Sequence, residues 1–303
     1  MNCLVTGGAG FIGSHLVDRL LIDGHKVTVI DNFSTGKLEN LKGKKIKLFK
    51  KDICENLDAI FKNGKFNVVF HLAGLPLIQL SIENPDETAK ASVNGTLQLL
   101  ESCVKYGVKK FVYTSSSAVY GDQADLPMVE DEIPNPKSPY AIQKLMGEHY
   151  CWFFANVHGL ATIIFRAFSV YGPRQIPNSS YGVIPRFIQA VENKRDIVIN
   201  GDGNQTRDFV YVSDVVDALV ASISLKNNIY KGEIFNLANG KNISINDLAK
   251  KIIGKNKIKI KHNPALVEQK DTLADISKAK KLLNWKPKIS LDEGLRLTGQ
   301  FSD

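Results

Sequence analysis

The stretch NCLVTGGAGFIGSH, residues 2–15, decides the fold. A short apolar strand leads into Gly7, Gly10 and Gly13, and apolar residues at helical spacing follow over 11–23. The spacing predicts a tight turn at Gly7, a close backbone approach to a pyrophosphate at Gly10, and helix–sheet packing at Gly13. The helix N-terminus offers unpaired N–H groups and a partial positive charge to phosphates. The stretch therefore predicts a dinucleotide site.

The same alternation of strand and helix continues through the first two-thirds of the chain. The predicted strands are 4–7, 27–31, 45–49, 67–73, 110–116 and 161–168. The predicted helices between them are 11–23, 86–105 and 139–158. This pattern indicates an α/β protein with a Rossmann-type, doubly wound parallel sheet covered on both faces. Ligands bind at the carboxyl ends of the strands in such folds.

The regular alternation of strand and helix ends at about residue 170, and beyond it loops rich in Gly, Pro and Asn separate shorter elements. We expect a dinucleotide-binding domain over 1–170, with returning segments near 207–240, and a smaller C-terminal α/β lobe over 171–303. The expected elements of this region are a helix near 183–193, a segment at 207–225, a strand at 233–238 and helices near 245–253 and 277–283.

Two acidic residues follow the second and third strands. Asp31 ends the second strand, where a carboxylate accepts hydrogen bonds from both ribose hydroxyls and repels a 2′-phosphate, which favours NAD over NADP. Asp52 ends the third strand, either beside the adenine or as a plain surface residue.

Tyrosine and lysine stand four positions apart at two places, Tyr106–Lys110 and Tyr140–Lys144. Gly107 ends the helix just after Tyr106, and a strand follows that contains Lys110. The spacing of the first pair is therefore expected to be a coincidence. Tyr140 follows Pro139 at the start of a helix that continues past Lys144, so the second pair shares one helix face. A tyrosine with a pKa of about 10 is a poor base at neutral pH, but a neighbouring ammonium stabilises the phenolate.

The fifth strand ends in TSSSAVYG, at the edge where ligands bind. A serine hydroxyl there can hold a substrate alcohol and carry its proton to the phenolate. The residues alone do not choose among Ser115, Ser116 and Ser117, since serine is common at strand ends.

With these motifs the chain resembles the extended short-chain dehydrogenase/reductases of the NAD-dependent sugar epimerase/dehydratase family, and within it the UDP-glucose (UDP-galactose) 4-epimerases. The matching motifs are TGGAGFIGSH, VIDNFSTG, HLAG, TSSSAVYG, SPYAIQK, RAFSVYGPRQ, GDGNQTRDFVYVSDVV and ADISKAKKLLNWKP. The resemblance implies that the domain over 1–170 binds NAD and that the lobe over 171–303 binds a nucleotide sugar. It also implies Tyr140 as the base, Lys144 as its partner and ribose contact, and Ser116 as the catalytic hydroxyl.

The resemblance also implies two sets of binding residues. Those for the cofactor are Gly7, Gly10, Phe11, Ile12, Gly13, Asp31, Asn32, Ser34, Thr35, Gly36, Asp52, Ile53, Leu72, Ala73, Gly74, Asn94, Ser115, Tyr140 and Lys144. Those for the substrate are Ser116, Ser117, Ser169, Val183, Asn200, Arg207, Glu268 and Thr272. No metal site is expected.

Related dehydratases carry an Asp-Glu pair just after the catalytic hydroxyl, and decarboxylases commonly carry a Glu there. This chain has Ser117 and Ala118 instead. The expected reaction is therefore 4-epimerisation of a UDP-hexose through a transient 4-keto sugar. The alternatives are a UDP-uronate 4-epimerase or decarboxylase and, from another class, a non-catalytic dinucleotide-binding regulatory protein, which the presence of the complete catalytic set disfavours.

Several residues expected to bind the nucleotide part of the substrate differ from the family pattern. Arg207 matches the diphosphate-binding arginine and Glu268 the ribose-contacting acid, but Asn200 replaces an aromatic residue that stacks on uracil. Ala265 stands where a second diphosphate arginine is usual, and Ser169 replaces a frequent Asn. Candidates for the missing charge are Lys261, Lys270 and Arg174.

Thr272 bears on which sugars the site accepts, because relatives that handle only unacetylated sugars often carry a tyrosine at its position. A small residue leaves room for a 2-acetamido group, so UDP-GlcNAc and UDP-GalNAc are possible further substrates. Thr272 as an ordinary loop-to-strand residue is equally compatible with the sequence.

Composition limits the remaining classes. The 303 residues are 44% hydrophobic and 23% charged, and the net charge is +8 with dispersed lysines, which favours solvated faces over a nucleic-acid surface. No apolar run reaches the length of a membrane span and no signal segment precedes the first strand, so we expect a cytoplasmic protein. The four scattered cysteines are expected to be buried thiols. Family members are usually dimers, so a homodimer is also expected.

Overall fold

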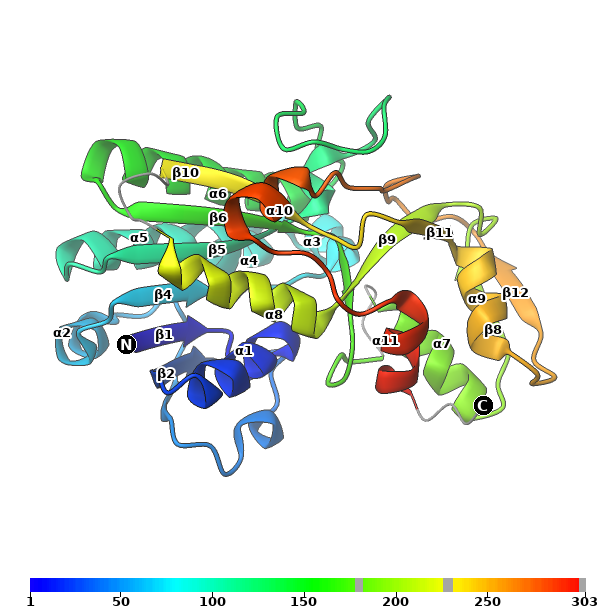
Figure 1. Ribbon diagram of the computed structural model, residues 1–303, viewed down its shortest axis with the longest axis horizontal. Coiled ribbons are helices and arrows are strands. Elements are labelled where there is room, and N and C mark those ends of the chain that lie inside the picture. The colour runs from blue at the N-terminus through cyan, green and yellow to red at the C-terminus, as the bar shows by residue number, and fades with distance from the viewer. Residues whose placement is uncertain (178–181, 226–230, 300–303) are drawn as a thin grey trace.

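The computed structural model describes residues 1–177, 182–225 and 231–299, and its larger part is a seven-stranded parallel sheet (Figure 1). The strand order is β10-β6-β5-β4-β1-β2-β3. The strands are β1 Asn2–Thr6, β2 Lys26–Asp31, β3 Lys47–Lys50, β4 Val68–His71, β5 Lys110–Ser116, β6 Ala161–Ala167 and β10 Lys231–Leu237. The predicted doubly wound fold is confirmed. Its order reverses between β1 and β4, which creates a crevice at the carboxyl ends of the strands.

Helices cover both faces of this sheet, because successive strand residues point to opposite sides. Cys3 and Val5 of β1 share a core with α1 and α8, whereas Leu4 between them belongs to the core under α5 and α6. The helices of this part are α1 Phe11–Ile22, α2 Asp58–Gly64, α3 Ile78–Glu83, α4 Pro85–Ala89, α5 Gly95–Lys105, α6 Pro139–His158, α8 Val212–Ala221 and α10 Ser277–Leu283.

The remaining elements build a smaller lobe beside the carboxyl edge of the sheet (Figure 1). A three-stranded sheet has the order β11-β9-β7, and β12 pairs with β8. These strands are β7 Ser169–Tyr171, β8 Ile197–Asn200, β9 Thr206–Tyr211, β11 Asn242–Ser244 and β12 Ile260–Asn263. The helices packed on them are α7 Val183–Glu192, α9 Ile245–Ile253 and α11 Leu291–Thr298.

Two expectations need correction, and four short strands were missed. The helix predicted over 86–105 is α4, a π-helical turn at Lys90–Asn94 and α5, and the wider turn comes just before Gly95, whose backbone lies against Ile53. Cys54 is exposed, although Cys3, Cys103 and Cys151 are buried free thiols as expected. The short strands β7, β8, β11 and β12 were not predicted, because three or four residues carry no clear alternation.

Within the described residues, no helix is long and apolar enough to cross a membrane.

Candidate active site

One cavity of about 690 Å³ lies where the carboxyl ends of the large sheet meet the smaller lobe. The sheet contributes residues that follow β1, β2, β4 and β5, and the lobe contributes residues of α7, β8 and β9. Nearly all predicted site residues line it, although two do not. The exceptions are Gly36, where an added Cβ would lie 2.8 Å from the Ala9 Cβ, and Asn94, which is exposed at the end of the π-helical turn. The predicted contacts of these two residues with the cofactor therefore stay predictions.

The glycine turn has the geometry that a pyrophosphate requires. Gly7 has a φ of 71°, and a side chain on Gly13 would lie 2.1 Å from the Gly7 carbonyl oxygen. Gly10 is the N-cap of α1 and gives it no side-chain hydrogen bond, so the first N–H groups of the helix remain directed toward the cavity end. These residues fit a bound dinucleotide, since the backbone and the helix dipole are both available to phosphates.

Asp31 lies at the carboxyl end of β2 and is held by the glycine turn. Its Oδ2 accepts a hydrogen bond from the backbone N–H of Ala9 at 2.8 Å, and its Oδ1 accepts one from Phe33 at 2.8 Å. Burial raises the pKa of this carboxyl, and the two N–H donors oppose the shift. Each oxygen retains a lone pair, which suits the two hydroxyls of a ribose.

Tyr140 and Lys144 lie on the first turns of α6, as predicted. The Ser138 hydroxyl caps the helix by accepting from Ala141 at 3.2 Å, and Pro139 occupies the first turn. The backbone N–H of Tyr140 donates to the Ser81 hydroxyl of α3 at 3.0 Å. These contacts fix the start of the helix, and both side chains of the pair line the cavity.

The Lys144 ammonium is buried but has a partner. Its Nζ donates to the Thr114 carbonyl at 2.8 Å and lies 5.0 Å from the centre of the Tyr113 ring. Burial lowers the pKa of Lys144 to about 8, and the nearby Glu148 carboxylate opposes the shift. An ammonium at this place is a short-range positive charge beside the predicted base.

Ser116 ends β5 and caps the 3-10 turn at Ser117–Tyr120. Its hydroxyl oxygen accepts from the Ala118 N–H at 3.1 Å, so its own proton is left for another acceptor. Ser115, by contrast, is buried, and its hydroxyl donates to Glu148 at 2.5 Å. The structure thus separates Ser115, whose hydroxyl is bound to Glu148, from Ser116, whose proton is available at the cavity.

A buried ion pair, not predicted from the sequence, lies directly behind these residues. The Arg166 guanidinium donates to Glu148 at 2.7 and 3.0 Å, and each side chain is only 3% exposed. The guanidinium also donates to the Glu130 carbonyl at 3.0 Å and stacks on the Tyr120 ring. The sequence signal for this pair was a charged residue, Arg166, within the apolar strand ATIIFRAF, because a buried arginine needs a buried partner of opposite charge.

The second tyrosine–lysine pair is separated, as expected. Tyr106 donates to Asp58 at 2.8 Å. Lys110 lies in β5, where its ammonium donates to the carbonyls of Ser222, Ile223 and Leu225. This lysine therefore binds carbonyl groups beyond α8 and has no part in the cavity.

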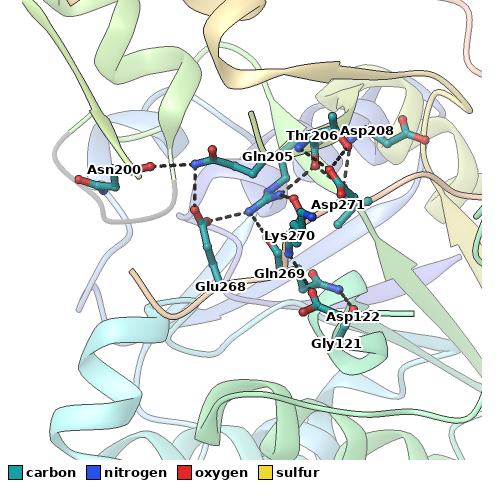
Figure 2. Close-up of polar contacts among 12 residues, drawn as sticks. Gly121, Asp122, Asn200, Gln205, Thr206, Asp208, Glu268, Gln269, Lys270 and Asp271 are labelled. Carbon is teal, nitrogen blue, oxygen red and sulfur yellow. Dashed lines mark hydrogen bonds and ion pairs between the residues drawn. The ribbon is translucent and has the colours of Figure 1, made fainter. Parts of the chain in front are cut away.

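At the lobe end of the cavity, Arg207 of β9 binds the segment 268–272. Figure 2 shows Glu268, Gln269, Lys270 and Asp271 of this segment beside Gln205 and Thr206. Its guanidinium donates to the Gln269 carbonyl at 2.7 Å and pairs with Glu268 at 2.8 Å. The Gln269 amide in turn donates to the carbonyls of Ser117 and Gly121, at 3.1 and 2.6 Å. This segment therefore joins the lobe to the turn that follows Ser116.

Thr272 belongs to the same segment and lines the cavity. It is 2% exposed, and its hydroxyl accepts from the Asp208 N–H at 3.2 Å. The hydroxyl of Thr272 is therefore bound to the backbone of β9. Neither Gln269 nor Glu148 was singled out from the sequence, although Glu148 stands one helical turn after Lys144.

Among the described residues, no group of three His, Cys, Asp or Glu side chains is placed to hold a metal ion.

Comparison with known proteins identifies the family. Residues 3–238 match the model of the "NAD dependent epimerase/dehydratase family". The chain is 38% identical over 310 residues to the UDP-glucose 4-epimerase of Mycolicibacterium smegmatis (99% of this chain, 98% of that protein), and 39% identical over 315 residues to the UDP-glucuronate 4-epimerase of Thermodesulfobacterium geofontis (99% and 95%). The crystal structure of the Thermotoga maritima UDP-glucose 4-epimerase with UDP-glucose is similar, with a TM-score of 0.94, 40% identity and coverage of 98% of this chain and 97% of that chain. The predicted family and its cofactor are confirmed, and the chain belongs to the NAD-dependent epimerase/dehydratase family.

Proposed function

We propose that this protein is an NAD-dependent 4-epimerase of a UDP-hexose, which it converts through a transient 4-keto sugar. The observation that carries the proposal is the single cavity that joins the glycine turn, the Ser116–Tyr140–Lys144 group and the polar lobe end at Arg207. A non-catalytic binding protein would have no need of this catalytic set.

The residues act in sequence on the C4 hydroxyl of the sugar. Ser116 holds that hydroxyl and passes its proton to the Tyr140 phenolate, and the Lys144 ammonium stabilises the phenolate electrostatically. NAD, when bound by the glycine turn and Asp31, supplies a reversible hydride acceptor. Tyr140 later returns the proton to the opposite epimer.

The residues after Ser116 argue for epimerisation alone. The carboxylates that line the cavity, among the described residues, are Asp31, Asp52, Glu87 and Glu268. None of them belongs to the 115–118 turn, where related dehydratases and decarboxylases carry their extra acid. Elimination of water or loss of CO₂ lacks its catalytic group at this place.

A UDP-uronate 4-epimerase is the second candidate, supported by the 39% identity to a UDP-glucuronate 4-epimerase. Incubation of the NAD-loaded protein with UDP-glucose, UDP-galactose, their N-acetyl forms and UDP-glucuronate, followed by chromatography, separates the candidates. We expect UDP-glucose and UDP-galactose to interconvert, and the N-acetyl pair as well if the space beside Thr272 admits the acetamido group. Conversion of UDP-glucuronate alone would replace the proposal with the second candidate.

We also propose a homodimer formed through α6. Ile142, Met146, Phe153 and Val157 are exposed apolar residues at helical spacing on this helix. They form one stripe on the side away from the buried Tyr140 and Lys144.

Phe153→Asp is expected to convert the dimer to a monomer, because a carboxylate on the stripe would be desolvated in the interface. Sedimentation velocity measures the change. Ile133→Asp serves as the control, because Ile133 is 83% exposed in a loop outside α6. A Phe153→Asp protein that remains dimeric at micromolar concentration would place the interface elsewhere.

A further inference from the structure

The basic side chains that line the cavity differ in whether they already have partners. They are Lys51, Lys90, Lys137, Lys144, Arg186 and Arg207. Lys51 pairs with Glu55 and Lys137 with Asp122. Lys90 is exposed and lies beside Cys54, near the end predicted for the adenine. The cations of the lobe end are therefore Arg207 and Arg186.

Arg207 has few donors left for a ligand. Its Nη1 donates to the carbonyls of Thr206 and Lys270, at 2.8 and 3.1 Å, and its Nη2 to the Gln269 carbonyl at 2.7 Å and to Glu268 at 2.8 Å. A guanidinium has five N–H groups, so these contacts leave chiefly the Nε–H. The Glu268 carboxylate also offsets its charge.

The cations that the sequence suggested as substitutes do not line the cavity. Lys261 is 65% exposed and pairs with Asp196. Arg174 pairs with Asp18 and donates to the Ser14 hydroxyl, which directs it toward α1. The Lys270 side chain is exposed, while its backbone N–H donates to Asp122 and its carbonyl accepts from Arg207. The prediction that one of these three supplies the missing charge is not supported.

Arg186, unlike those three residues, lines the cavity. It lies on α7, lines the cavity between Val183 and Phe187 of the same helix, and is half-buried. Its guanidinium makes no hydrogen bond or ion pair with any other described residue. Burial lowers the pKa of Arg186 and the charge of Glu268 opposes this shift, but an arginine remains protonated in proteins. A partly desolvated cation that has no hydrogen-bond partner among the described residues is stabilised by an anion that enters the cavity.

We propose that Arg186 binds the diphosphate of the nucleotide sugar, in place of the arginine that related enzymes carry at the position of Ala265. The proposal rests on the proposed function. Arg186 belongs to the lobe end, with Asn200 and Glu268, whereas the sugar C4 must lie at Ser116 and Tyr140 on the sheet. The diphosphate is the anionic group on the nucleotide side of the sugar, and a guanidinium matches its oxygens in pairs.

Titration calorimetry of the NAD-loaded protein tests the assignment with UDP, uridine, UDP-glucose and UDP-glucuronate. Arg186→Gln is expected to weaken UDP and both UDP-sugars by about 10- to 100-fold, because a charge-assisted contact is lost. Uridine binding should not change. Arg186→Lys, which keeps the charge without the fork, should lose less affinity than Arg186→Gln. Lys261→Gln removes the same charge outside the cavity and should bind every ligand like the wild type.

The other outcomes overturn the assignment. Equal affinity of the wild type and Arg186→Gln for UDP would exclude the diphosphate role and leave the proposed function standing. A loss shared by uridine would point to the base or to cavity shape, and a loss confined to UDP-glucuronate would point to the sugar carboxylate. GDP and dTDP are titrated alongside, so that the charge effect is measured whatever the base. A wild-type protein that retains NAD but binds none of the three diphosphates would overturn both proposals.

Discussion

Tyr140→Phe is expected to lower kcat for the interconversion of UDP-glucose and UDP-galactose by about 10³-fold, while NAD stays bound. The substitution removes one hydroxyl, and general acid–base catalysis by a positioned side chain contributes about 10²- to 10⁴-fold. The helix start is unaffected, since it depends on the Ser138 cap and on the backbone N–H of residue 140. The rate is measured by chromatography of products, and bound NAD by absorbance of the released cofactor.

Tyr106→Phe is the matched control for this prediction. It removes a tyrosine hydroxyl that donates to Asp58 on the surface. Tyr106 has the same spacing from a lysine as Tyr140, but its helix ends before that lysine. Its turnover should equal that of the wild type. If Tyr140→Phe retained turnover within about threefold of the wild type, Tyr140 would not be the base.

Arg166→Met is expected to lower the free energy of unfolding by about 3–5 kcal/mol, because it leaves the Glu148 carboxylate buried without its partner. Both side chains of the pair are 3% exposed, so water cannot replace the guanidinium without a change of packing. Urea unfolding followed by fluorescence measures the loss. Glu148 also accepts from Ser115 and lies near Lys144, so turnover should fall as well.

Two further variants show whether the cause is the unpaired charge. The double variant Arg166→Met with Glu148→Met should be more stable than Arg166→Met alone, since apolar replacements of a whole buried pair are often neutral. Arg195→Met removes an exposed arginine and should change stability by less than about 0.5 kcal/mol. A single variant as stable as Arg195→Met would show that the buried pair contributes little.

The sequence predicted the parts of the molecule that local pattern determines. The glycine turn, Asp31 at the end of β2 and the helix that begins at Pro139 each depend on neighbours within a few residues. Their periodicity and capping residues are therefore visible in the chain itself. The same reasoning separated Tyr140–Lys144 from Tyr106–Lys110.

The lobe end of the cavity could not be predicted in the same way. Arg207 donates to the carbonyls of Gln269 and Lys270, more than 60 positions away, and a sequence does not show which backbone carbonyls a side chain will bind. Arg186 appears in the sequence only as one arginine on an amphipathic helix, and its place at the cavity depends on how α7 packs on the lobe core. Partner choice between distant segments is set by tertiary packing, which local spacing does not report.

The most direct test of the proposed function is NMR of UDP-glucose incubated with the NAD-loaded protein in D₂O. Epimerisation with hydride returned to the same carbon predicts that UDP-galactose forms with hydrogen, not deuterium, at C4, and that the hexose keeps all its carbons. Formation of no UDP-galactose, deuterium at C4 of the product, or a product that has lost water or CO₂ would contradict the proposal.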